Sequence, residues 1–282
     1  MQRRPGGERP VVHCVPLASY ANDPLADHRW ALVVAHPGHE LRVFHFLERG
    51  RPLVAVLTDG SGSLGVSRLD HTTRLLQETG ATRSAVYGRF TDREAYAHLM
   101  ARSPTSFVEA AGELARSFDD HGITAVIADT AEGYNPVHDV CRAIAAAAAR
   151  MCRRCAPILF EVDLVGHPDG PGAGIRLRLD DDAFARKLGA VRRYGMLASE
   201  AQSAFDLHGV EAFRTEFLRR PGATVLSPAD HVPYYERVGD ERVRQGRYGS
   251  ALRYGEHVRP VLAALQAVRT VKPHALTFDS LH

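Results

Sequence analysis

ALVVAHPGHE, residues Ala31–Glu40, carries the clearest indication of the fold of this chain. It begins as an unbroken apolar run, which is typical of a strand buried on both faces of a parallel sheet. The run stops abruptly at a polar turn that carries His36, His39 and Glu40. In an open α/β sheet, ligands bind at the carboxyl ends of the strands. The stretch therefore predicts both a central strand and a functional site at its end.

Apolar runs and segments with helical spacing alternate on the C-terminal side of this strand. Further buried strands are predicted at 52–58, 83–87, 123–128 and 156–162, and helices at 40–49, 67–79, 105–121 and 137–150. Such alternation indicates a parallel sheet with crossover helices on both faces. We therefore expect an α/β fold, a Rossmann-like three-layer sandwich with a mostly parallel sheet.

The two ends of the chain differ from this pattern. Residues 1–28 are punctuated by Pro, Gly, Asn and Asp and are expected to form an N-terminal extension. After residue 166 we expect a turn at 168–172, an edge strand at 175–179, a helix over 182–206 and a mostly helical remainder. No repeat or clear linker is present, so 29–282 is predicted to be one domain, with 166–282 as its variable, mostly helical C-terminal part.

Composition excludes several classes of protein. The 282 residues are 45% hydrophobic and 24% charged, with a net charge of +2, which is typical of a globular domain and gives no argument for nucleic-acid binding. The sequence contains no run of 18 apolar residues, so no membrane span is expected. The basic N-terminus is not followed by the apolar segment of a signal peptide, so a signal peptide is not expected either. The four cysteines, including the C-x-x-C pair Cys152 and Cys155, are expected to be ordinary thiols in a reducing cytoplasm.

A second polar cluster, DTAEGYNPVHD at Asp129–Asp139, follows the strand predicted at 123–128. Because parallel strands end at one edge of a sheet, His138 can converge there with His36 and His39. Three imidazoles form the ligand set of an open catalytic zinc site. The alternative interpretation is that these histidines, like others among the 15 in the chain, are structural or solvated side chains that bind no metal. The candidate general bases around such a metal are Asp139, Glu40, Glu132 and Asp129.

Ala35–Glu40 resembles the Ala-His-Pro-Asp-Asp-Glu signature of the LmbE-like, or PIG-L, family of zinc-dependent N-acetylglucosamine deacetylases. Gly133–Asp139 is similar to the second motif of that family, and Arg68 with Asp70 and His71 is similar to its helical Arg-x-x-Glu element. The resemblance covers about residues 30–165. It implies one Zn²⁺ per chain, or another divalent metal, and hydrolysis of an N-acetyl group by the zinc-bound water.

The chain departs from the family pattern at the site itself. Gly38 stands where the family has its general base, and His39 stands where the family has an Asp ligand. Counted from Tyr134, the family's second-motif ligand falls on Asp139, one residue after His138. We take His36, His39 and His138 as metal ligands and Asp139 as base or orienter, while the reverse assignment of His138 and Asp139 stays open.

The remaining site residues follow from the same resemblance. Tyr134 resembles a family tyrosine that polarises the tetrahedral intermediate, and simple packing over the site is its alternative. Asp59, Arg68 and Glu132 are expected to contact the substrate. The loop at 59–63 lacks the glycine order and the lysine of nucleotide-binding loops. The aromatic segments 233–237 and 248–257 could roof a sugar pocket or serve helix packing or an oligomer contact.

The expected function is removal of an N-acetyl group from an amino sugar or a sugar-bearing small molecule. One alternative is a metal-dependent hydrolase of a non-sugar amide in a secondary-metabolite pathway. Another is a non-catalytic family member that acts as a binding protein, which Gly38 favours. We expect a cytoplasmic protein whose partner is its N-acetylated small-molecule substrate, with no nucleic acid or membrane partner and with homo-oligomerisation left open.

Overall fold

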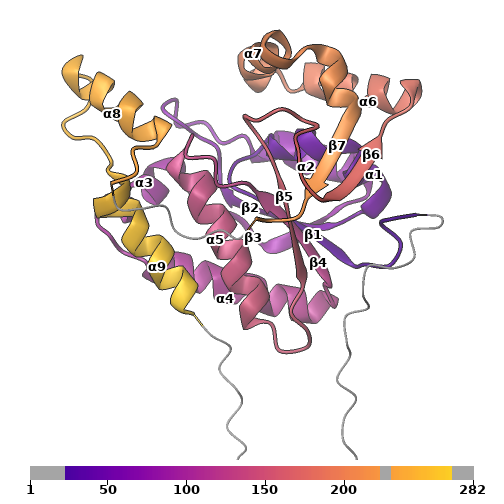
Figure 1. The fold of residues 1–282 in the computed structure, drawn as a ribbon, viewed down its shortest axis with the longest axis horizontal. Helices are drawn as coiled ribbons and strands as arrows, with labels where there is room; N and C mark the ends of the chain where they lie inside the picture. The colour runs from indigo at the N-terminus through magenta and orange to yellow at the C-terminus, as the bar shows by residue number, and fades with distance from the viewer. Residues whose placement is uncertain (1–22, 223–229, 269–282) are drawn as a thin grey trace, which may run out of the picture.

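A seven-stranded sheet forms the middle layer of the computed structural model, which describes residues 23–222 and 230–268 (Figure 1). The strand order is β3-β2-β1-β4-β5-β7-β6. The strands are β1 (Trp30–Val34), β2 (Leu53–Thr58), β3 (Thr82–Phe90), β4 (Ala125–Asp129), β5 (Ile158–Val162), β6 (Gly174–Arg178) and β7 (Thr215–Arg219). Strands β1 to β5 run parallel, whereas β7 pairs antiparallel with β5 and β6. The prediction of a three-layer, mostly parallel α/β sandwich is confirmed.

Strand β1 is buried on both faces because its alternate side chains enter two separate cores. Ala31 and Val33 belong to one core, and Leu32 and Val34 belong to the other. The first core is covered by α3 (Asp92–Met100), α4 (Thr105–His121), α5 (Pro136–Met151) and α9 (Arg259–Ala267). The second is covered by α1 (Phe44–Gly50), α2 (Leu69–Thr79) and α6 (Asp181–Arg193). Crossover helices on both faces are thus confirmed.

The order of the strands reverses between β1 and β4. From β1 the chain moves outward to β2 and β3, and it returns to β4 on the other side of β1. Ligands of doubly wound sheets bind outside the carboxyl ends of the strands at such a switch point. The turn after β1 and the loop between β4 and α5 both emerge here, so the two polar clusters meet at this edge.

The C-terminal part corrects two predictions. The helix predicted over 182–206 is two helices, α6 and α7 (Ala198–His208), which a short 3-10 turn at Gly195–Leu197 separates. The break falls at Tyr194, whose ring is buried against the second core and whose hydroxyl donates to the Arg68 carbonyl at 3.2 Å. The remainder predicted as mostly helical contains β7, inserted between β5 and β6.

Strand β7 was missed because a buried charge interrupts its apolar pattern. Glu216, in its middle, is 1% exposed. Its carboxylate accepts hydrogen bonds from the backbone N–H groups of His45 and Phe46 and from Lys187 Nζ, at 2.8, 2.8 and 2.9 Å. The strand is therefore held by long-range polar contacts that local sequence does not reveal.

Three C-terminal helices lie on either side of the upper part of the molecule in Figure 1. Helix α8 (Tyr234–Arg244) lies at the upper left, and α6 and α7 lie at the upper right. Most of the predicted N-terminal extension lies outside the described residues, but Leu25 is buried and its carbonyl accepts a hydrogen bond from Trp30 Nε1 at 2.9 Å. No helix in the described ranges combines the length and the apolarity needed to cross a bilayer.

Candidate active site

Strand β1 delivers two imidazoles to the switch point through a tight turn. Gly38 adopts a φ of 107°, and its N–H donates to Glu40 Oε2 at 2.7 Å. This left-handed conformation, which glycine adopts without the penalty that a side chain brings, turns the chain between His36 and His39. Their ring centroids lie 5.2 Å apart.

Helix α5 brings the third imidazole. Asn135 caps the helix by accepting the N–H of Val137 at 2.9 Å, and Pro136 occupies its first position. His138 therefore projects from the first turn. Its ring centroid lies 5.2 Å from that of His36 and 4.7 Å from that of His39. The structure thus brings together the three histidines named from the sequence, and their role as metal ligands stays a prediction.

The buried carboxylate of Asp129 and the hydroxyl of Thr58 hydrogen-bond to two of these rings. Nδ1 of His39 lies 2.8 Å from Asp129 Oδ2, which also accepts the N–H of Ala35 at 2.7 Å. Nδ1 of His36 lies 2.7 Å from Thr58 Oγ1 and 3.0 Å from Asp92 Oδ1. Metal-binding histidines are commonly held in this way, with one nitrogen on a carboxylate and the other free for the ion.

His138 lacks such an orienting partner. Its Nδ1 is buried and has no hydrogen-bond partner in the described part of the chain. Burial lowers the pKa of His36 and lowers the pKa of His138 well below its usual value, and neighbouring imidazoles add to both shifts. Both rings are therefore neutral at neutral pH, which is the form that binds metal.

The spacing of the rings fits a shared metal ion. A ring whose nitrogen lies about 2.1 Å from zinc has its centre roughly 3.2 Å from the ion, so three tetrahedral ligands have centres roughly 5 Å apart. The observed centroid distances of 4.7–5.2 Å match this value. As the side chains stand, no three His, Cys, Asp or Glu residues of 23–222 and 230–268 gather their donor atoms around one point. The convergence is thus one of the imidazole rings, at centroid distances of 4.7–5.2 Å.

Two of the carboxylates predicted as bases serve as backbone anchors. The carboxylate of Glu132 accepts the N–H groups of Leu164, Val165 and Gly166 at 2.8–3.1 Å. Glu40 is fully buried, and it accepts the Gly38 N–H and the Thr72 hydroxyl, the latter at 2.6 Å. These bonds hold the loop after β5 and the turn after β1.

Asp139 has a different environment. Its Oδ1 accepts the Gly133 N–H at 3.1 Å, and its side chain is buried. Burial, and to a lesser degree the nearby Glu132, raises the pKa of Asp139 to about 7. The structure therefore provides a carboxyl group next to His138 that changes its protonation near neutral pH.

A cavity of about 580 Å³ opens over the three histidines. Helices α6 and α7 and the turn between them supply most of its apolar wall, including Leu188, Leu197 and Phe205, whereas Arg68, Tyr134 and Asn135 supply polar groups. The Nε of Arg68 is buried without a hydrogen-bond partner among the described residues. Two of the residues predicted to contact substrate or intermediate, Arg68 and Tyr134, thus lie on this wall.

The other predicted site residues lie off the cavity wall. Asp59 accepts the N–H and the hydroxyl of Ser61, at 3.0 and 2.7 Å, and does not line the cavity, and neither do Glu40, Glu132 or Asp139. Glu200 of α7 is the one carboxylate among the described lining residues. Its position depends on the helix break at Tyr194, which the sequence analysis missed.

Asp92 is a second residue that the sequence analysis missed. It is the first residue of α3, directly after the capping residue Thr91 and two residues beyond the end of β3. Thr91 and Glu94 form a capping box, with the Thr91 hydroxyl accepting the Glu94 N–H and the Glu94 carboxylate accepting the Thr91 N–H. The pattern Thr-Asp-Arg-Glu shortly after the strand predicted at 83–87 is the signal that could have located Asp92 at the strand ends.

No family model and no curated protein match this chain. Among solved structures, it is similar to the A40926 pseudoaglycone deacetylase Dbv21, with 21% identity and a TM-score of 0.44, over 60% of this chain and 83% of that chain. It is also similar to the conserved protein TT1542 from Thermus thermophilus, with 18% identity and a TM-score of 0.45, over 73% of this chain and 100% of that chain. At these values the likeness is one of fold alone.

Proposed function

We propose that this protein is a metal-dependent hydrolase that removes an N-acetyl group from an amino sugar or a sugar-bearing small molecule. The observation that carries the proposal is the convergence of His36, His39 and His138 at the switch point between β1 and β4. The resemblance of Ala35–Glu40 to the LmbE-like deacetylase signature supports the same reaction.

The three histidines would hold one divalent metal, for which zinc suits an imidazole set. When bound, such an ion polarises an amide carbonyl and lowers the pKa of a water molecule. Asp129 would keep Nε2 of His39 directed to the ion by holding Nδ1, and Asp92 with Thr58 would do the same for His36.

The remaining steps would belong to side chains of the cavity and its surroundings. Arg68, with its unpartnered buried Nε, would bind a hydroxyl of the sugar. The hydroxyl of Tyr134 would donate to the oxygen that gains charge as the carbonyl is attacked. Asp139 would accept a proton from the attacking water and pass it to the leaving nitrogen, which balances the release of acetate and free amine.

The first experiment measures metal content by elemental analysis of the full chain. The wild type is expected to hold about one zinc per chain. His36→Ala, His39→Ala and His138→Ala should each lose it. His121→Ala is the matched control, because His121 lies at the far end of α4 and its imidazole bonds only to the Ser117 carbonyl among the described residues. Metal retained in all three site variants would contradict the proposal.

The second experiment measures acetate release from a panel of N-acetyl amino sugars and non-sugar N-acetyl amides. Release from the sugars, lost in the zinc-free variants, is the expected result. Release from the non-sugar amides alone would favour the hydrolase of a non-sugar amide. No release from either class by a zinc-loaded protein would argue against hydrolysis.

A non-catalytic binding protein is the second candidate function. The observation that favours it is Gly38, since the position that carries the family's base has no side chain here and the Leu197 side chain fills the space beside it. Saturable binding of an N-acetyl amino sugar without acetate release, measured by calorimetry on the zinc-loaded chain, would support this candidate.

A further inference from the structure

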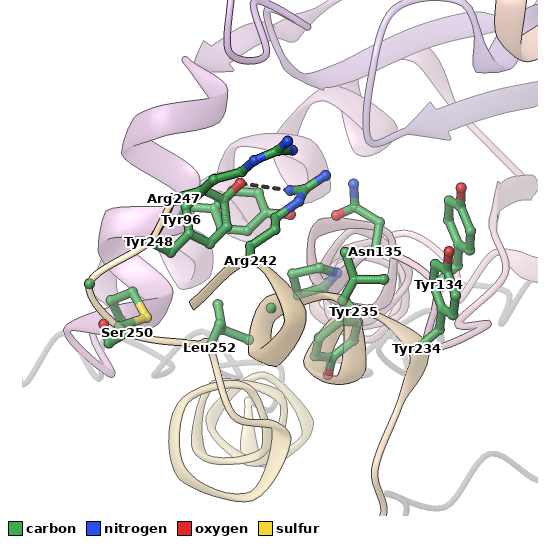
Figure 2. Close-up of a pocket in the computed structure, with 15 residues that line it drawn as sticks. Tyr96, Tyr134, Asn135, Tyr234, Tyr235, Arg242, Arg247, Tyr248, Ser250 and Leu252 are labelled. Carbon is green, nitrogen blue, oxygen red and sulfur yellow. Dashed lines mark hydrogen bonds between the residues drawn. The ribbon is translucent and has the colours of Figure 1, made fainter. Parts of the chain in front are cut away.

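A second cavity, of about 610 Å³, lies beside the candidate active site and is shown in Figure 2. We call it the tyrosine cavity, because its wall contains Tyr96, Tyr134, Tyr234, Tyr235 and Tyr248. The last three come from α8 and the segment that follows it. None of the steps proposed above uses this cavity, apart from the contribution of Tyr134.

The tyrosine cavity shares a wall with the cavity that opens over His36, His39 and His138. Tyr134 and Asn135 line both of them. The Nδ2 of Asn135 lies 3.4 Å from Nε2 of His36, so one face of this wall touches the imidazole cluster. A molecule whose N-acetyl group lies over the histidines could therefore extend across Asn135 into the tyrosine cavity.

Flat aromatic surfaces mark one side of the tyrosine cavity. The rings of Tyr134 and Tyr234 are stacked, with centroids 5.0 Å apart and planes 4° apart, and Figure 2 shows them side by side. Both side chains are nearly half exposed, at 45% and 47%. An exposed stack of this kind offers a planar ligand an aromatic face at little cost in side-chain entropy.

Two guanidinium groups mark another side. Figure 2 shows the charged ends of Arg242 and Arg247 near one another. Arg242 donates to the Tyr248 hydroxyl at 2.6 Å, and within 23–222 and 230–268 neither arginine has a carboxylate within ion-pair distance. The acidic residues of α8 are already engaged, because Glu236 and Asp240 pair with Arg253 and Glu241 pairs with Arg244.

We propose that the tyrosine cavity binds a planar aromatic group that carries an oxyanion, at the end of the substrate remote from its N-acetyl group. The tyrosine faces would stack on the ring, and the two guanidinium groups would bind the carboxylate or phosphate, often in a bidentate manner. An aryl acid and a nucleotide both have this chemistry. The link to the substrate rests on the proposed deacetylation, whereas the binding site itself does not.

The test uses the full chain and measures dissociation constants by calorimetry. The probes are 2-naphthoate, which represents an aryl acid, and uridine 5′-monophosphate, which represents a nucleotide. Inorganic phosphate and 2-naphthol, which supply the charge and the ring separately, are the reference ligands. At least one probe should bind at least tenfold more tightly than both reference ligands, because a probe contacts both the tyrosine rings and the guanidinium groups, whereas each reference ligand contacts only one of them.

Variants assign the binding to this cavity. Arg242→Gln and Arg247→Gln should each weaken the probe by about tenfold, because a hydrogen bond to a charged group is lost. Tyr234→Leu should weaken it by roughly threefold through the lost stacking. Arg244→Gln is the matched control, since Arg244 lies on the same helix and pairs with Glu241 outside the cavity. It should leave the affinity unchanged.

The outcomes separate this inference from the proposed function. Probes that bind no better than the reference ligands, or an Arg244→Gln variant as weak as Arg242→Gln, would overturn the tyrosine cavity as a site. His36→Ala should keep probe affinity while it loses zinc and acetate release. Probe binding without acetate release would refute deacetylation alone, and acetate release without probe binding would refute the cavity alone.

Discussion

Leu197 and Gly38 are in direct contact across 159 residues of sequence. The Leu197 side chain fills the space that a β-carbon at position 38 would occupy, and the Tyr194 ring lies next to it. Gly38 also has a φ of 107°. The C-terminal elaboration therefore covers position 38, and the absence of a side chain there is a requirement of packing.

Replacement of Gly38 by Ala should destabilise the fold for two reasons. The left-handed backbone costs about 1–2 kcal/mol for a residue with a β-carbon, and the overlap with Leu197 adds about 1–3 kcal/mol. Urea unfolding measures the sum. Gly65→Ala is the control, because Gly65 has a φ of 69° and open space beside it. Gly38→Ala/Leu197→Ala should lose the overlap contribution, and equal losses in Gly38→Ala and Gly65→Ala would contradict the argument.

Asp129→Asn should weaken zinc binding by about 10–100-fold, because the carboxylate orients His39. Competition with a chromogenic chelator gives the affinity. The fold should survive, since an amide oxygen can still accept the Ala35 N–H. Asp120→Asn changes an exposed carboxylate of α4 and should leave the zinc affinity as it is. An unchanged affinity in Asp129→Asn would remove Asp129 from the metal site.

Removal of metal should leave the protein folded but less stable. The two apolar cores do not depend on the imidazoles. Zinc at 100 times its dissociation constant should add about 2.7 kcal/mol to the free energy of unfolding. Thermal melting with and without a chelator measures the difference. His138→Ala should melt at the same temperature in both conditions, and a zinc-dependent shift in that variant would place the ion elsewhere.

Asp139→Asn tests the proposed proton carrier. The variant keeps the size of the side chain and its acceptor for the Gly133 N–H, so zinc content should not change. Loss of proton transfer should lower kcat for acetate release by about 10²–10⁴-fold with little change in KM. Glu200→Gln is the comparison, since Glu200 lies on the cavity wall. A large loss in Glu200→Gln and none in Asp139→Asn would assign the role to Glu200.

Lys187→Met should be strongly destabilising, by about 3–5 kcal/mol, because it leaves the buried Glu216 without its cation. Urea unfolding measures the loss. Lys187→Met/Glu216→Gln should recover part of it, since the uncompensated charge is gone. Arg193→Met breaks an exposed pair with Glu78 and should cost less than about 1 kcal/mol. Similar losses in the two single variants would show that burial does not matter here.

Local sequence patterns were enough to predict the parallel sheet and the convergence of the three histidines. Apolar runs and helical spacing are local properties, so they located β1, β2, β4 and β5 and the helices α1, α2, α4 and α5 to within a few residues, whereas α3 was missed. Since parallel strands end at one edge, the turn after β1 and the helix after β4 had to bring His36, His39 and His138 to the same place.

The contacts of each carboxylate, by contrast, depend on how distant segments of the chain pack together. Asp129 orients a histidine 90 residues away, Glu132 anchors a loop 32–34 residues later, and Glu216 anchors the start of α1. The pairing of β7, the contact of Leu197 with Gly38 and the approach of Asp92 to His36 likewise join distant segments. Local periodicity reports which face of an element is buried, whereas the partner of a buried polar group depends on which distant segment packs against it.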